Sequence, residues 1–244
     1  MIYMGSKARI AKHILSIVLK DRKEGQWYVE PFAGGMNTIC LVDGHRIASD
    51  ANPYLIQMWR AIKYDADMPK EITREMYDHY KAKFDSGCKS DMHITGWVGY
   101  MASFKGKFFS GYSGVYTKRN YIKESINNTL RQFKSFDGIE FVDGEYQSLI
   151  IPPKSIIYCD PPYKNTTEYN GFSKFDHGVF YEWCKKMKGD GHSVFVSEND
   201  MPIPFREVWS MPAKRTLGIS TTINTTERLY SNLTWMKKDS NLTL

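Results

Sequence analysis

Several features that mark particular protein classes are scarce or missing in this sequence. Only four cysteines occur among 244 residues, and no two of them form a CxxC pair. We therefore expect free, buried thiols in a reducing compartment rather than a disulfide framework or a zinc site. No stretch approaches the ~18 consecutive apolar residues of a membrane span, and the N-terminus lacks the apolar segment and cleavage site of a signal peptide. The expectation is a soluble, cytoplasmic protein that needs no metal.

Common nucleotide-binding and base-modifying motifs are also missing. The chain contains neither GxGxxG nor GxxxxGK[ST], so a loop that cradles phosphates is poorly supported. It also lacks the HxE and PCxxC motifs of zinc-dependent base deaminases. A ligand that is nucleoside-like, rich in hydroxyls and free of phosphate fits these absences better.

What the chain does contain is a basic excess and many aromatic residues. Its formal net charge is +6, and 14% of its residues are aromatic. Because Lys and Arg contact phosphates and rings stack on bases, this composition favours a nucleic-acid partner. Both residue types gather in the window 100–123, which holds no Asp or Glu. A solvated, loop-rich surface is the alternative there. The candidate DNA contacts in this window are Lys105, Lys107, Tyr112, Lys118 and Arg119.

The order of apolar runs and breaks predicts an α/β fold. An amphipathic pattern predicts a helix from Ser6 to about Lys20. Short strands follow at Trp27 to Val29 and at Arg46 to Ser49, each ending in an acidic loop, and later apolar runs end at Asp143 and Asp160. Repeated strand, acidic loop and helix are typical of a doubly wound, mostly parallel sheet.

The same patterns predict the rest of the sheet and the domain organisation. HSVFVSEND predicts one more strand, and TERLYSNLTWMKK predicts a last strand, antiparallel at the sheet edge. Between residues 68 and 138 the alternation stops, and the segment is more polar and richer in Lys and Tyr. We therefore predict a main domain of residues 1–67 and 139–244, into which a smaller helical or loop-rich domain of residues 68–138 is inserted.

Four predicted strands end in a carboxylate: Glu30, Asp50, Asp143 and Asp160. In open α/β sheets the ligand lies beyond the C-terminal ends of the strands. One such acid can be a helix cap or a turn former, but clustered carboxylates repel each other unless a ligand supplies partners. We therefore expect a ligand rich in hydrogen-bond donors, with Asp50 accepting from a ribose.

The stretch SIIYCDPPYKN ends a buried strand with a carboxylate and two prolines, which cannot continue a strand or a helix. DPPY at this strand end, EPFAGG upstream and YMGSK near the N-terminus together resemble the Dam-like DNA adenine N6 methyltransferases of the alpha group. The resemblance spans nearly the whole chain and is weakest over residues 68–138. It implies a Rossmann-like methyltransferase fold whose insertion recognises double-stranded DNA, in a bacterial cell or a phage-infected host, in the setting of restriction–modification.

The resemblance further implies S-adenosylmethionine (SAM) as the methyl donor. Phe32, Ala33 and Gly34 would wrap its methionine part, Asp50 would hold its ribose, and Asp143 would approach its adenine. The residues that the resemblance assigns to the cofactor pocket are Tyr3, Lys7, Glu30, Phe32, Ala33, Gly34, Asp50, Asp143 and Asp160. It implies no metal, and we expect a monomer or a weak dimer.

The DPPY residues suit methyl transfer to adenine N6, whose lone pair is delocalised into the ring. The Asp160 carboxylate and the Pro161 carbonyl can accept hydrogen bonds from the amine and stabilise its developing positive charge. Pro162 restricts Pro161, and Tyr163 offers a face on which the purine stacks. The base must leave the duplex to reach them. The following segment, residues 164–178, fits either a lid over the base or a surface loop.

Two alternatives stay open at this point. RNA and protein glutamine methyltransferases share related tetrapeptides, although many prefer Asn at the first position. An inactive methyltransferase retained as a DNA-binding regulator is the other alternative, against which the intact Asp160–Tyr163 argues. Within SVFVSEND, Glu198 stands where the family usually has Asn.

Overall fold

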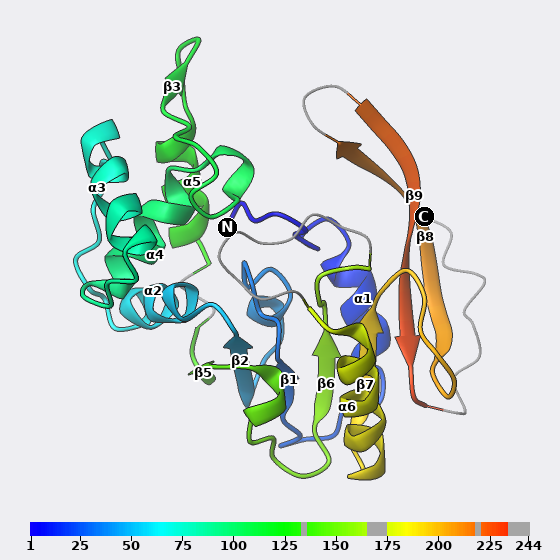
Figure 1. Cartoon of the computed structure of the whole chain (residues 1–244). Helices are drawn as coiled ribbons and strands as arrows, with labels where there is room; N and C mark the ends of the chain where they lie inside the picture. The colour runs from blue at the N-terminus through cyan, green and yellow to red at the C-terminus, as the bar shows by residue number, and fades with distance from the viewer. Residues whose placement is uncertain (133–135, 165–174, 218–220, 234–244) are drawn as a thin grey trace.

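The computed structural model describes residues 1–132, 136–164, 175–217 and 221–233. Its centre is a seven-stranded sheet of order β5-β2-β1-β6-β7-β9-β8 (Figure 1). The first five strands in this order are parallel, and β9 is antiparallel to both β7 and β8. The predicted mostly parallel α/β sheet is thereby confirmed. The strands are β1 (Tyr28–Glu30), β2 (Arg46–Asp50), β5 (Ile139–Asp143), β6 (Ile156–Cys159), β7 (Ser193–Ser197), β8 (Arg206–Leu217) and β9 (Thr221–Ser231).

Successive side chains of the parallel strands point to opposite faces of the sheet, and each face is buried in its own core. Tyr28 and Tyr158 face the core beneath helices α1 (Ala11–Val18) and α2 (Pro53–Lys63). Val29 and Ile157 face the other core, which helix α6 (His177–Gly189) covers. The chain is therefore wound on both sides of the sheet. Short 3-10 turns complete the fold at η1 (Ile39–Leu41), η2 (Phe104–Gly106) and η4 (Tyr146–Ser148).

The first helix is shorter than its periodicity predicts, since it begins at Ala11 rather than at Ser6. No side chain caps its N-terminus, and the preceding residues form turns in which the Ile10 amide donates to the Lys7 carbonyl at 2.9 Å. Helix α2, by contrast, starts at a defined cap, where the Asn52 side chain accepts from the amides of Tyr54 and Leu55. The consequence is that Lys7 lies in a turn outside α1.

The prediction of an antiparallel edge strand near the C-terminus is wrong in one respect. Strand β9 is antiparallel, but it lies between β7 and β8, and β8 forms the edge. The sequence of β8 contains Pro212, which pairs with Thr226 of β9. A proline has no amide to donate, so an edge strand tolerates it where a central strand does not. Because of that proline and the polar residues around it, the sequence of β8 lacks the alternating apolar pattern that predicts a strand.

The segment 68–138 stands beside the end of the sheet formed by β5, whereas the β8–β9 hairpin stands at the other end (Figure 1). It forms helices α3 (Arg74–Asp85), α4 (Met92–Met101) and α5 (Tyr121–Leu130) and a two-stranded hairpin of β3 (Val115–Tyr116) and β4 (Arg119–Asn120). Helix α4 packs tightly on α2: a Cβ on Gly96 would lie 2.1 Å from the Tyr54 carbonyl oxygen. Trp97 and Met101 join the same core as α1 and α2. The insertion thus shares its core with the main sheet, and the division into two domains stays a prediction.

The cysteines are free, as predicted, but only Cys159 and Cys184 are buried, whereas Cys40 and Cys88 are half-buried. No helix in the described ranges is long and apolar enough to cross a membrane. Among those same residues, no group of three or more His, Cys, Asp or Glu side chains is placed to hold a metal ion.

Candidate active site

The C-terminal ends of β1, β2, β6 and β7 meet at one edge of the sheet, as parallel strands require. Asp50 ends β2, Asp160 follows β6, and Glu198 follows β7. The insertion and the β8–β9 hairpin stand on opposite sides of this edge (Figure 1). The site is therefore assembled from segments that are far apart in the chain.

Asp160 lies in a compact ionic cluster. The Lys7 ammonium lies 3.2 Å from Asp160 Oδ1 and 3.4 Å from Glu227 Oε2. The Tyr163 hydroxyl donates to Glu227 Oε2 at 3.0 Å, and Lys7 Nζ lies 4.5 Å from the centre of the Tyr163 ring. The cluster joins the N-terminal turn, the DPPY loop and β9. Lys7 is buried in it, with 9% of its side chain exposed, whereas Asp160 keeps 22% exposed and can be reached.

The charges in this cluster shift each other's proton affinities. Burial raises the pKa of Asp160 to about 6, Lys7 opposes that rise, and Glu227 adds to it. Burial alone would lower the pKa of Lys7, but its ion pairs with Asp160 and Glu227 outweigh this, so that its pKa is raised. The Lys7 ammonium is therefore shared between the side chains of Asp160 and Glu227.

A second part of the site is the turn after β1, where EPFAGG meets Asp50. Gly34 adopts a left-handed backbone with φ +46°, and its amide donates to Asp50 Oδ2 at 3.0 Å. The Asn52 amide donates to Asp50 Oδ1 at 2.9 Å. The Tyr3 ring packs directly on this turn, since a Cβ on Gly34 would lie 2.7 Å from Tyr3 Cε1. Burial raises the pKa of Asp50 to about 6.

Helix α2 and the insertion both support this glycine turn, through Trp59 and Tyr100 respectively. Trp59 Nε1 donates to the Gly34 carbonyl at 3.1 Å, and Asn52 Nδ2 donates to the Tyr100 hydroxyl at 2.8 Å. The rings of Tyr3 and Tyr100 lie 5.7 Å apart. Helix α4 thus helps to position Tyr3, which no local sequence pattern predicts.

On the other side of the turn, Phe32 extends into an aromatic cluster. Its ring lies 5.3 Å from Tyr146, 5.7 Å from Phe175 and 5.6 Å from Phe180. Ala33 is buried, and its amide donates to the Ser49 carbonyl at 2.8 Å. The backbone of the EPFAGG turn is therefore held in place on both sides.

The other two strand-end carboxylates, Glu30 and Asp143, are also paired within the protein. Glu30 is 2% exposed and accepts hydrogen bonds from the Tyr28 hydroxyl at 2.7 Å and from Thr38 Oγ1 at 3.1 Å. Burial raises its pKa to about 8. Asp143 lies opposite Asp50 in the β2–β5 register and forms an ion pair with Arg60 at 2.8 Å. All four carboxylates thus have donors within the protein, so their grouping does not by itself require a ligand, and their contact with one stays a prediction.

The candidate DNA contacts have different environments in the insertion. Lys105, Lys118 and Arg119 are exposed, Lys107 is half-buried, and Lys118 lies in the tight turn between β3 and β4. Arg119 is already paired, because its Nε and Nη2 donate to the two Glu124 carboxylate oxygens at 2.7 Å.

Tyr112 differs from these basic residues because it is half-buried inside the insertion. Its hydroxyl donates to the Ile72 carbonyl at 2.9 Å, and its ring packs 5.5 Å from the Tyr77 ring. This packing indicates a structural role for Tyr112. DNA contact by the five candidates remains a prediction.

Glu198 is enclosed at the end of β7, with 1% of its surface exposed. Its Oε1 accepts from the Asn199 amide at 2.7 Å, and its Oε2 lies 3.6 Å from His177 Nδ1. Burial raises its pKa to about 7, and the nearby Asp160 adds to this rise. Most of the predicted lid, residues 165–174, lies outside the described residues.

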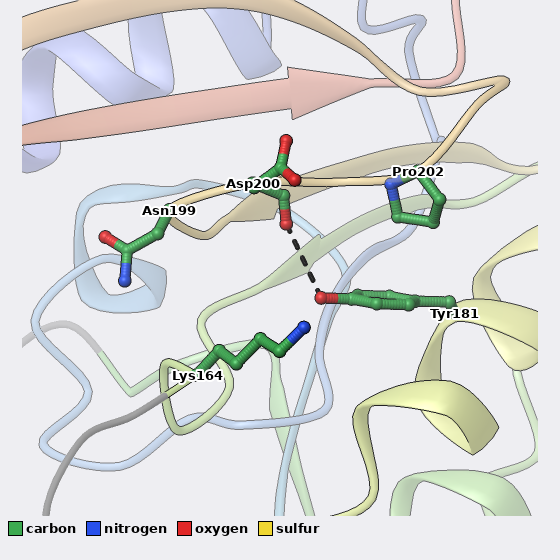
Figure 2. Close-up of a pocket in the computed structure, with 5 residues that line it drawn as sticks. All are labelled: Lys164, Tyr181, Asn199, Asp200 and Pro202. Atoms are coloured by element: carbon green, nitrogen blue, oxygen red, sulfur yellow. Dashed lines mark hydrogen bonds between the residues drawn. The ribbon is translucent and has the colours of Figure 1, made fainter.

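A pocket of about 370 Å³ lies next to the DPPY loop (Figure 2). Lys164, which follows Tyr163, forms one wall, and Tyr181 of α6 forms another. The Tyr181 hydroxyl donates to the Asp200 carbonyl at 3.5 Å. Asn199 and Pro202, from the loop after β7, complete the lining.

Glu227 is the residue in this site that sequence reasoning missed. It lies on β9, 64 positions after Tyr163. It belongs to no motif, and alternation along β9 says only which face of the strand it occupies. Its contact with Lys7 and Tyr163 arises from the order of the strands in the sheet.

Comparison with known proteins decides the family. The model of the D12 class N6 adenine-specific DNA methyltransferases matches residues 3–240. The chain belongs to this family. The predicted activity, adenine-specific methylation of DNA, is thereby confirmed at the level of the family, in preference to RNA or protein glutamine methylation.

Relatives of this D12-class chain carry consistent names. It is 23% identical over 240 residues to the retron Ec67 DNA adenine methylase of Escherichia coli, covering 85% of this chain and 82% of that protein. It is 24% identical over 211 residues to a DNA adenine methylase of Vibrio cholerae, covering 72% and 74% respectively. Among solved structures, the methyltransferase SMU.472 complexed with SAH aligns with 93% of this chain and 53% of its own chain, with a TM-score of 0.33 and 12% identity.

Proposed function

We propose that this D12-class chain methylates N6 of an adenine extruded from double-stranded DNA, with SAM as donor and with Asp160 and the Pro161 carbonyl as acceptors of the amine. One observation carries this proposal: Asp160 Oδ1 holds a nitrogen donor, the Lys7 ammonium, at 3.2 Å. A carboxylate that binds an N–H group at the end of a buried strand is what the amino group of adenine needs.

The residues around the glycine turn fit a cofactor with a ribose. Each Asp50 oxygen accepts one backbone amide, which orients the carboxylate and leaves lone pairs for the hydroxyls of a diol. Gly34 keeps its backbone open to a ligand, and Tyr3 and Phe32 offer apolar walls next to it. When bound, SAM would supply an electrophilic methyl group on a sulfonium. Asp50, Gly34, Tyr3 and Phe32 would hold it, with Glu30 shaping the turn from beneath.

At the acceptor side, the chain supplies charge and rigidity. With a pKa of about 6, Asp160 is mostly ionised at neutral pH and can accept from the amine without first losing its own proton. It stabilises the positive charge that develops on nitrogen. Pro161 and Pro162 hold the accepting carbonyl in one orientation at little entropic cost. The ring of Tyr163 gives the extruded purine a surface for stacking.

Binding of the duplex is assigned to the basic surface of the insertion. Lys105 and Lys118 are exposed there. The helices of the insertion stand on the side of the sheet opposite the β8–β9 hairpin (Figure 1). Such contacts would be made chiefly to phosphates and would depend on salt concentration. The same proposal places the enzyme in the cytoplasm, where the DNA is.

A methyl-transfer assay tests the proposal. Labelled SAM is offered with unmethylated plasmid duplex, its denatured single strands, RNA and a protein mixture, and nucleosides from the products are identified. The expected product is N6-methyladenine in duplex DNA. Transfer to RNA or protein alone would overturn the proposed substrate, and no transfer despite binding of SAM and DNA would indicate a regulator.

The variant Asp160→Ala tests the assigned role of the carboxylate. It should abolish transfer and leave DNA affinity nearly unchanged, because phosphate contacts supply most of the binding. The matched control is Asp190→Ala, which removes a surface carboxylate at the far end of α6 and should retain full activity. An Asp160→Ala enzyme with even a tenth of the wild-type rate would contradict the role.

A further inference from the structure

Glu227 contacts two residues of the proposed acceptor site at once. Its Oε2 accepts from the Tyr163 hydroxyl at 3.0 Å and lies 3.4 Å from Lys7 Nζ. It reaches them from β9, within a hairpin that the DPPY motif does not specify. Its side chain is 23% exposed, so the contact lies at the mouth of the site.

Sharing of Lys7 by two carboxylates matters when an amine arrives. Asp160 is the predicted acceptor for the adenine amino group, and Lys7 Nζ occupies that acceptor in the structure. When Asp160 also accepts from the amine, its carboxylate is divided between two donors and its hold on Lys7 weakens. Lys7 is buried, and a buried cation without a counterion is strongly unfavourable. Glu227 provides a second counterion while Asp160 is shared in this way.

The same carboxylate also orients the stacking ring. A hydrogen bond from the Tyr163 hydroxyl to Glu227 limits the rotation of the side chain at its far end. The ring then presents a constant face next to Lys7, 4.5 Å away. One residue outside the motif thus holds both the stacking ring and the lysine that pairs with the acceptor Asp160.

We propose that Glu227 is a positioning residue for methyl transfer, which retains Lys7 and the Tyr163 hydroxyl while Asp160 also accepts from the amino group of the target adenine. The inference rests on the proposed function and extends it to β9. It predicts that the hairpin strand β9, and not only the DPPY loop, determines the rate of the chemical step.

Several charged and titratable groups shift the pKa of Asp160, so removal of one of them changes the pH at which this carboxyl titrates. Lys7 lowers its pKa, whereas burial and Glu227 raise it. Removal of the Glu227 carboxylate takes away one of the groups that raise this pKa and leaves Lys7 to pair with Asp160 alone, so both changes lower it. The other titratable groups in electrostatic contact with Asp160 are Glu30 on β1, Tyr158 and Cys159 on β6, Tyr163 in the DPPY loop and Glu198 after β7.

The kinetic test compares Glu227→Gln with Glu207→Gln. Glu207 lies on the neighbouring strand, is 24% exposed and pairs with Arg228, so the control removes the same charge from the same hairpin without touching Lys7. Glu227→Gln should lower kcat on plasmid duplex roughly 10- to 100-fold, as expected for a misplaced reacting group, with little change in KM for DNA. The acidic side of the pH–rate profile of Glu227→Gln, its acid limb, should also move to lower pH. Glu207→Gln should stay within about twofold of wild type, because surface changes of this kind are small.

The acid limb separates positioning from a loss of structure. A variant that is merely less stable loses rate without a shift of the limb to lower pH. Thermal unfolding of each variant monitors folding, and Glu227→Asp, which keeps the charge, should recover part of the rate. Wild-type kcat and an unmoved acid limb in Glu227→Gln would overturn the proposal.

A measurement without turnover distinguishes this inference from the proposed function. The side-chain carboxyl of Asp160 is followed by NMR in ¹³C-aspartate-labelled protein, with Asp160→Asn providing the assignment. Its titration midpoint should be lower in Glu227→Gln than in wild type, and the same midpoint in both would refute the role of Glu227. If the midpoint falls while wild type methylates no DNA, the contact network stands and the proposed function fails.

Discussion

Gly34 tests the proposed cofactor turn with one added methyl group. The substitution Gly34→Ala places a Cβ 2.7 Å from Tyr3 Cε1 and 3.0 Å from Tyr3 Cζ. These distances are shorter than carbon atoms tolerate, so the Tyr3 ring has to move. The backbone at Gly34 is also left-handed, with φ +46°, which disfavours any residue with a Cβ.

The chain contains a matched control for the backbone part of this effect. Gly25 is left-handed too, with φ +71°, but a Cβ there would meet nothing within 4 Å. Gly25→Ala should therefore lower the free energy of unfolding only by the left-handed cost, roughly 1–2 kcal/mol. Gly34→Ala carries the same cost and also disturbs the contact between Tyr3 and Tyr100, an aromatic pair of the kind worth about 0.5–1.5 kcal/mol. We expect Gly34→Ala to be the less stable variant by about that second amount.

Urea unfolding gives the two stabilities, and calorimetric titration with S-adenosylhomocysteine gives the affinities. Gly34 donates its amide to Asp50, so a shift of this turn misplaces the carboxylate that we assign to the ribose. Gly34→Ala should bind the ligand at least ~10-fold more weakly, equivalent to about 1.4 kcal/mol, and Gly25→Ala should bind it like wild type. If both variants have the same stability and the same affinity, the reasoning about Tyr3 and the turn is refuted.

Three further outcomes are expected. Methyl transfer should fall as the pH drops through about 6, since protonated Asp160 is a poor acceptor, and initial rates that stay constant down to pH 5 would contradict this. The folded chain keeps a proton on Glu30 up to about pH 8, whereas the unfolded chain loses it near 4.5. This group therefore makes the free energy of unfolding fall as pH rises through that window. In urea unfolding, Glu30→Gln should remove about 2–3 kcal/mol of that fall between pH 6 and 8. Lys118→Ala should reduce the salt slope of DNA binding by about 1. Arg119→Ala should reduce it less, because Glu124 already pairs with Arg119. Equal reductions of the slope in filter-binding assays would argue against that pairing.

Local chemistry explains why much of the main sheet could be predicted. Strands β1, β2 and β6 are short apolar runs that end in an acid or a Pro-Pro pair, so their bounds are correct to within about a residue or two. Strand β8 could not be predicted, because an edge strand with Pro212 and many polar residues has no periodic apolar face. The sequence also predicts the start of α1 too early, because the apolar periodicity extends beyond the uncapped N-terminus of the helix at Ala11.

The site residues divide in a similar way. Asp160 and Gly34 belong to contiguous motifs whose backbone chemistry is local. The motif alone predicts Lys7 as a site residue, and only the fold shows that its ammonium lies between two carboxylates. Arg119 had the right charge for DNA, but its partner Glu124 lies one helical turn into α5 and outside the window that suggested it.

The sequence by itself determined the family, the alternation of parallel strands with acidic turns, and the tetrapeptide that we propose as acceptor, because these depend on residues adjacent in the chain. Only the tertiary structure decided that Glu227 joins Lys7 and Tyr163, that Arg60 pairs with Asp143, and that β9 lies inside the sheet. These contacts link segments separated by many residues, and the packing of both sheet faces, which no local periodicity encodes, brings them together.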